Sequence, residues 1–121
     1  MSKKDLKEVK KCSGEYVLAV KDTLNVISGK WKLPIIGTLL YGKKRFNELI
    51  REIPNINPRM LSKELKELEI NGIVKRKVIS NIPPVVEYEL TSSGKSFRKV
   101  LDVMVKWGLE HRKNIIGKSS K

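Results

Sequence analysis

The sequence predicts an α+β fold that is mostly α, and three observations lead to this prediction. Apolar residues recur at three- and four-residue steps over most of the chain, which is the pattern of helices with one buried face. After Gly72 the period falls to about two and β-branched residues become frequent, as in strands. A length of 121 residues with 40% hydrophobic and 32% charged content suits one compact domain.

The first two predicted helices are separated by a glycine. The first begins at about Tyr16 and ends at Ser28-Gly29, because glycine adopts the left-handed conformation that closes a helix. The second begins at about Lys30 and ends before Gly42. Pro34 falls in its first turn, where backbone N–H groups have no acceptor within the helix, so the proline loses no bond.

Two shorter helices follow. The first has two turns, with Asn47 as its predicted N-cap and Pro54 as its stop. After a tight connection, Asn57-Pro58 predicts a second helix start, since the Asn57 side chain can accept from first-turn N–H groups and proline presets φ. This helix ends at Asn71-Gly72, and its inward positions are Leu61, Leu65 and Leu68.

The C-terminal part is predicted to be a hairpin and a long helix. Strands over residues 73–79 and 85–90 bracket a tip that Pro83 and Pro84 stiffen. Thr91 is predicted to cap one final helix, in which Trp107, like Trp31 before it, is expected to anchor the core. The order helix, helix, short helix, tight turn, helix, hairpin, helix is that of a winged helix-turn-helix with a two-stranded wing.

The sequence also predicts how the chain divides into segments and what kind of partner its charge favours. We expect a flexible basic arm over residues 1–13, a winged-helix DNA-binding and dimerisation domain over 14–113, and a frayed tail over 114–121. Lysine plus arginine total 26 against 13 acidic residues, a net charge of +13. Such a positive field favours a polyanionic partner, although the charge excess also serves solubility.

The predicted helix after Asn57 has the features of a DNA-recognition helix. With its leucines turned inward, the opposite side presents cationic and hydroxyl groups, and a helix fits the width of the major groove. Arg59 is the candidate for a bidentate contact with guanine. The predicted contact residues are Asn57, Pro58, Arg59, Ser62, Lys63 and Lys66. An ordinary solvated face is the alternative, since Glu64 and Glu67 are also present.

Flanking segments supply further candidate contacts with double-stranded DNA. Those at the entry to the helix-turn-helix are Lys44, Arg45 and Asn47, and those on the wing are Arg76, Lys77, Ser80 and Asn81.

Several short motifs together resemble those of the HxlR-type winged-helix regulators. They are Gly29-Lys30-Trp31, Arg45-Phe46-Asn47-Glu48-Leu49, the segment from Met60 to Glu69, Pro83-Pro84, and Val86-Glu87-Tyr88-Glu89-Leu90-Thr91 with Gly94. The resemblance spans about Cys12 to Gly108 and implies homodimeric bacterial or archaeal transcription regulators of MarR-like architecture. It also implies inverted-repeat operators bound through the helix around Arg59, and dimerisation through the first and last helices. The chain departs from the family pattern at Val85, where members usually carry a basic residue, and at Ser13, where they often carry proline.

The two terminal helices themselves also predict a homodimer. Both carry more apolar residues than packing on their own domain requires, and a second copy would cover the remainder. Fuller wrapping of a small core is the alternative. The candidate interface residues are Val17, Val20, Leu24, Val103, Met104 and Trp107.

Cys12 is a candidate redox sensor. It is the only cysteine and follows Lys10 and Lys11, whose charges favour the thiolate. The resemblance supports this role, because some HxlR-type members sense quinones, aldehydes or oxidants through a cysteine near this position. An unreactive thiol is the alternative.

The sequence does not favour catalysis, a metal or a cofactor. It has one histidine, His111, whereas a metal site needs more than one such ligand. It also lacks an apolar run of the ~20 residues that a membrane span needs, and a secretory signal. We therefore expect a cytoplasmic regulator that is not an enzyme. The alternatives are a winged-helix protein-interaction module, and a single-strand or RNA binder, which the 6% aromatic content disfavours.

Overall fold

A computed structural model describes residues 13–119 of the chain. The chain divides into two compact units, of which the first ends at Lys30 and the second begins at Trp31. The first unit contains α2 (Ser13–Ile27), the first predicted helix. Gly29 has a φ of 89°, as expected for the residue that closes this helix. Cys12 and the predicted arm before it lie outside the described residues.

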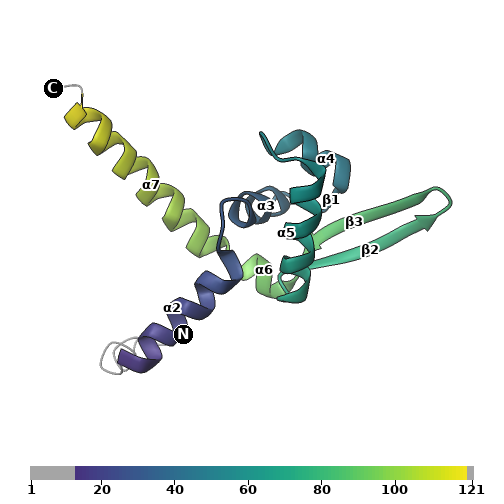
Figure 1. Cartoon of the computed structure of the whole chain (residues 1–121), viewed down its shortest axis with the longest axis horizontal. Helices are drawn as coiled ribbons and strands as arrows, with labels where there is room; N and C mark the ends of the chain where they lie inside the picture. The colour runs from purple at the N-terminus through teal and green to yellow at the C-terminus, as the bar shows by residue number, and fades with distance from the viewer. Residues whose placement is uncertain (1–12, 120–121) are drawn as a thin grey trace. The chain divides into compact units, whose positions relative to one another are not determined.

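The second unit holds the remaining elements. They are α3 (Lys32–Leu39), β1 (Lys44–Arg45), α4 (Phe46–Glu52), α5 (Pro58–Ile70), β2 (Val74–Asn81), β3 (Pro84–Leu90), α6 (Ser92–Ser96) and α7 (Arg98–Ser119). Figure 1 shows α3, α4 and α5 grouped at the root of the β2–β3 hairpin, which extends away from them. The predicted winged helix-turn-helix arrangement is therefore confirmed.

The core of the second unit lies where the three helices meet the root of the hairpin. The predicted inward face of α5 is confirmed, because Leu61, Leu65 and Leu68 are each exposed by no more than 1%. Burying a side chain of this size contributes about 1.5–3 kcal/mol. The other side chains that are almost fully buried are Ile35, Ile36, Leu49, Val74 and Leu90.

The two short helices begin differently. Asn57 caps α5 as predicted, since its Oδ1 accepts from the Met60 N–H at 2.8 Å and Pro58 is the first helical residue. The prediction that Asn47 caps α4 is wrong, because α4 already begins at Phe46. The Glu48 carboxylate accepts from the Arg45 N–H at 2.9 Å, and this bond stabilises the earlier start.

The sheet contains one strand more than the predicted wing. Its three strands are antiparallel in the order β1-β3-β2. The predicted hairpin is present, although Ser80, Asn81 and Pro84 belong to its ladder rather than to the tip. β1 pairs Lys44 with Tyr88 and Arg45 with Glu87. A strand of two residues is too short to show a period in the sequence, so it was not predicted.

The predicted final helix is interrupted near its start. Thr91 is a cap as expected, but of the short helix α6, and its Oγ1 accepts from the Gly94 N–H at 3.1 Å. At Phe97 the backbone N–H bonds to the carbonyl of Gly94, three residues earlier, and α7 begins with the next residue. α7 then continues to Ser119, past residue 113 where the sequence predicts the domain to end. No helix among residues 13–119 is long and apolar enough to cross a membrane.

Trp107 does not anchor the core, and this expectation is wrong. Its side chain is exposed by 64%, whereas Trp31 is partly buried. α7 packs against α3 near its own beginning, where Leu101 Cδ2 lies 3.4 Å from the position a Cβ would take at Gly37. Trp107 lies further along α7 and stacks on His111, with ring centroids 4.6 Å apart.

Candidate nucleic-acid interface

The outer side of α5 carries the predicted recognition residues, and all of them are exposed. They are Asn57, Pro58, Arg59, Ser62, Lys63 and Lys66. Because an α-helix turns by about 100° per residue, Arg59, Lys63 and Lys66 lie on the side opposite the buried leucines. Within residues 13–119, none of Arg59, Lys63 and Lys66 is held in an ion pair. This side of the helix is therefore available to an external anion.

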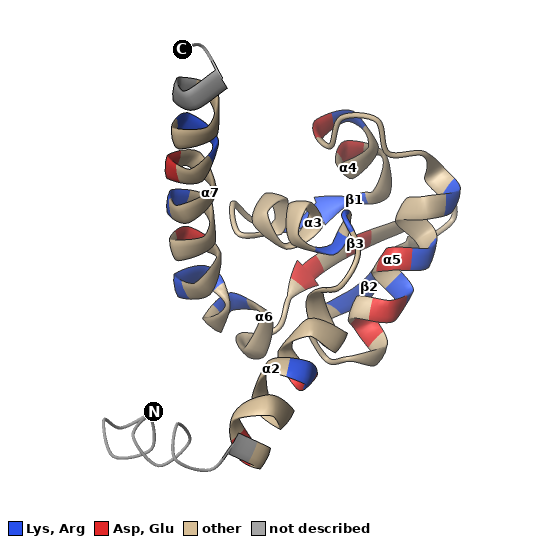
Figure 2. Ribbon diagram, turned by 60° about the vertical axis from the view of Figure 1, so that its left-hand side comes forward, with Lys and Arg blue, Asp and Glu red and all other residues tan. Residues whose placement is uncertain are grey.

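Two of the three acidic residues of α5, Glu64 and Glu67, pair with a buried lysine of α3. Lys32 is 5% exposed, and its Nζ lies 2.9 Å from Glu64 Oε2 and 3.5 Å from Glu67 Oε2. The two carboxylates lie one turn apart on the flank of α5, between the leucine face and the cationic face. Figure 2 shows basic and acidic residues alternating along α5. Nothing in the sequence indicates the burial of Lys32, because a lysine in a helix is normally exposed.

The entry residues lie at the junction of β1 and α4. Arg45 and Asn47 are exposed. Lys44 is partly buried, and its Nζ bonds to Glu52 Oε1 at 3.1 Å. The charge of Lys44 is therefore partly neutralised within the protein, whereas that of Arg45 points to solvent.

The wing carries its charges at the root of the hairpin. The register places Lys75 opposite Glu89 and Lys77 opposite Glu87 on one face, with Arg76 opposite Tyr88 on the other. The hydrogen bond and charge of Lys75, helped by the charges of Lys95 and Lys43, hold the pKa of Glu89 below its ordinary value. Arg76 and Lys77 are both exposed, as predicted for contact residues.

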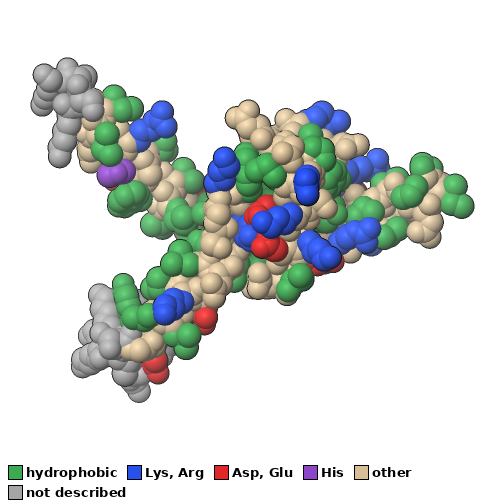
Figure 3. Space-filling view, viewed as in Figure 1, with side chains coloured by type: hydrophobic (Ala, Val, Ile, Leu, Met, Phe, Trp, Pro, Cys, Tyr) green, Lys and Arg blue, Asp and Glu red, His purple; other side chains and the backbone are tan. Residues whose placement is uncertain are grey.

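The wing tip has no charged residue. Residues 78–86 are all uncharged, and Ile82 is 92% exposed. Figure 3 shows hydrophobic side chains gathered at the end of the hairpin. Of the two polar candidates nearby, Asn81 is exposed and Ser80 is partly buried in the ladder.

The predicted interface residues of both terminal helices are exposed. In α2 these are Val17, Val20 and Leu24, exposed by 46%, 44% and 53%. In α7 they are Val103, Met104 and Trp107, exposed by 67%, 40% and 64%. Each helix therefore has an apolar surface that the described chain leaves uncovered.

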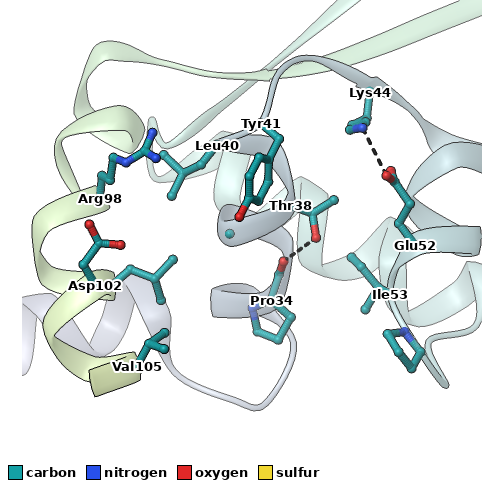
Figure 4. Close-up of a pocket in the computed structure, with 13 residues that line it drawn as sticks. Pro34, Thr38, Leu40, Tyr41, Lys44, Glu52, Ile53, Arg98, Asp102 and Val105 are labelled. Atoms are coloured by element: carbon teal, nitrogen blue, oxygen red, sulfur yellow. Dashed lines mark hydrogen bonds and ion pairs between the residues drawn. The ribbon is translucent and has the colours of Figure 1, made fainter. Parts of the chain in front are cut away.

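An open hollow of about 730 Å³ lies between α7 and the helices α3 and α4. Figure 4 shows Arg98, Asp102 and Val105 of α7 on one side of it, with Pro34 and Thr38 of α3 between them and Ile53. Sequence analysis did not predict this hollow. Among the described residues, no group of three or more His, Cys, Asp or Glu side chains can hold a metal ion.

Comparisons with known proteins agree with this architecture. The sequence profile described as HxlR-like helix-turn-helix matches residues 26–115. The HTH-type transcriptional regulator YtcD of Bacillus subtilis (strain 168) is 45% identical over 103 residues, which cover 85% of this chain and 82% of that protein. This relative is a transcriptional regulator by name, and the family is one of regulators rather than enzymes, in agreement with the expectation from the sequence.

Two similar solved structures are of a redox regulator and of a quinone-bound protein. The structure of the redox regulator HypR in its reduced form is 43% identical, with a TM-score of 0.76, and covers 82% of this chain and 98% of its own. A quinone-bound structure of YodB from B. subtilis is 34% identical, with a TM-score of 0.66, and covers 76% of this chain and 97% of its own.

Proposed function

The chain belongs to the HxlR-like helix-turn-helix family of transcriptional regulators, and from this premise we propose that it binds an inverted-repeat operator in double-stranded DNA as a homodimer. In this proposal α5 enters the major groove, and the root of the wing contacts the adjacent backbone. The observation that carries the proposal is the outer side of α5, where Arg59, Lys63 and Lys66 are exposed and pair with no carboxylate of residues 13–119.

Each cation has a distinct proposed role. Arg59 lies in the first turn of α5, and the N-terminal residues of a recognition helix are those that approach base edges. Its planar guanidinium can contact O6 and N7 of one guanine together, which discriminates against other bases by about 1–3 kcal/mol. Lys63 lies one turn later and acts on phosphates as a point charge.

These roles predict different effects of two substitutions. Arg59→Ala should reduce the preference for the selected operator over random duplex, whereas Lys63→Ala should weaken both alike. The measurement is fluorescence anisotropy on an operator selected from a random DNA pool by the purified protein. Arg112→Ala and Lys99→Ala on α7 are controls with the same loss of charge. Equal loss of preference in the two test variants contradicts the assigned roles.

Selection from a random DNA pool and anisotropy on duplex, single-stranded and RNA probes distinguish a DNA-binding regulator from the alternative functions. Duplex binding should weaken steeply as salt rises, because each neutralised phosphate releases counterions. A selected consensus with two-fold symmetry supports the dimer. A protein-interaction module would select no DNA sequence, and a single-strand or RNA binder would prefer those probes to duplex.

We also propose that oxidation at Cys12 changes operator binding. The support is the similarity of this chain to the redox regulator HypR and to quinone-bound YodB. Because Cys12 is the only cysteine, a thiol oxidant can join two subunits through Cys12 or attach a small thiol to it. Treatment with diamide should change operator affinity in the native protein and not in Cys12→Ser, and an equal response in both contradicts this role.

A further inference from the structure

An ion cluster of Lys32, Glu64 and Glu67 joins α3 and α5. Lys32 is the only buried charged residue among those that the structure describes. Its side chain is 6% exposed, and those of Glu64 and Glu67 are 12% and 42% exposed. Charged groups are costly to bury unless they are paired, so a lysine at this position needs its partners.

Both partners belong to the helix whose other side is cationic. Glu64 and Glu67 follow Lys63 and Lys66 directly in the sequence of α5. In the major groove, two free carboxylates at these positions would face a phosphate backbone and oppose binding. Lys32 lies on the protein side of α5, because α3 packs against that helix. It therefore attracts both carboxylates toward the core and away from any ligand of the outer side.

We propose that Lys32 is a positioning residue for DNA recognition, which holds Glu64 and Glu67 back so that the groove-facing side of α5 stays cationic. This inference rests on the proposed duplex binding. Lys32 itself does not reach DNA in this proposal, because it is buried. Lys32 neutralises part of the negative charge of Glu64 and Glu67 and holds these two carboxylates on the side of α5 that faces α3.

Lys32→Met tests the proposal by removing the charge while keeping a similar side-chain length. The two carboxylates then lose their partner, and we expect operator affinity to fall roughly 3- to 10-fold at about 0.01 M salt. The deficit should shrink at about 0.15 M salt, because the Debye length falls from about 30 Å to about 8 Å. A packing defect alone would give a deficit that does not depend on salt. Lys32→Arg keeps the charge and should bind like the native protein.

A triple variant separates charge from packing. In Lys32→Met with Glu64→Gln and Glu67→Gln the ion cluster is absent, and neither Glu64 nor Glu67 remains to repel DNA. We expect this protein to bind the operator at least as tightly as the native chain at low salt. Because no unpaired buried charge remains in this variant, it is expected to fold even where Lys32→Met alone unfolds. Lys99→Met on α7 is the matched control for loss of one lysine charge.

The outcomes distinguish this inference from the proposed function. If the native protein shows no salt-dependent duplex binding, the proposed function fails first. If the native protein binds its operator but Lys32→Met binds equally well at low salt, the role of Lys32 is overturned. It is also overturned if the triple variant binds the operator more weakly than the native protein does. The proposal expects that neutralising Glu64 and Glu67 restores the binding that Lys32→Met loses.

Discussion

At the scale of single residues, side chains that cap helices and pair charges determine what α5 presents to solvent. Asn57 fixes where the helix begins, and therefore places Arg59 in its first turn. Lys32 pairs with Glu64 and Glu67 on the side of the helix that faces α3. The cationic face of α5 thus depends on residues that lie outside it.

The cap at Asn57 gives a prediction for stability. Asn57→Ala removes the acceptor for the Met60 N–H, and should lower the free energy of unfolding by about 0.5–2 kcal/mol. Asn47→Ala is the matched control, because Asn47 is exposed inside α4 and is not its cap, so a change within about ±0.5 kcal/mol is expected there. Urea unfolding followed by circular dichroism measures the free energy of unfolding of both variants. An equal decrease in the two would contradict a stabilising role for the Asn57 cap.

Some of these residues could be predicted from the sequence and others could not. Asn57 was predicted because Asn-Pro before an apolar period is a local signal. Lys32 was missed because its partner Glu64 lies 32 residues away, and nothing local to either residue indicates the contact. The N-cap of α4 was misplaced because Glu48, three residues after Arg45, competes with the Asn47 signal.

At the scale of elements, an apolar period over several turns predicts a helix well. It does not predict short strands or the positions at which a helix is interrupted. α5 has three leucines on one face, so its type, ends and buried side all follow from the sequence. β1 has two residues and depends on its pairing with β3, which is distant in sequence. The break between α6 and α7 lies at Phe97, whose N–H bonds to the Gly94 carbonyl three residues earlier, and a helical period does not reveal it.

The contact at Gly94 predicts a large effect of one added methyl group. A Cβ at this position would collide with the Ile73 carbonyl oxygen and lie 3.0 Å from Leu90 Cδ2. Gly94→Ala should therefore lower the free energy of unfolding by about 1–3 kcal/mol, because a tightly packed backbone must shift. Gly14→Ala is the control, since a Cβ there has no neighbour within 4 Å. Thermal unfolding of the two variants tests this, and similar melting temperatures would contradict it.

At the scale of the whole molecule, the uncovered apolar surfaces of α2 and α7 are the main feature that one chain leaves unexplained. The sequence predicted their apolar residues but assigned Trp107 to the core as well as to an interface. Periodicity identifies the apolar side of a helix, but not whether the same chain or a second copy covers it. In the structure Trp107 is 64% exposed, which leaves the interface as its proposed role.

The proposed dimer predicts a difference between two valines of α7. Val103→Glu places a charge beside Trp107 and Met104 in the proposed interface, and should shift the protein toward monomer. Val105→Glu is the matched control, because Val105 lies about 200° further round the helix and lines the hollow beside α3. Sedimentation analysis measures both, and a native mass in Val103→Glu would contradict this interface.

The burial of Lys32 also makes this amine a natural reporter of how the protein opens. Reagents that acylate amines attack the unprotonated, accessible form, so exposed lysines should be modified first and Lys32 last. The rate at which mass spectrometry finds a label on Lys32 then measures how often α3 separates from α5. Bound operator should slow that labelling if holding α5 in a groove also holds it against α3.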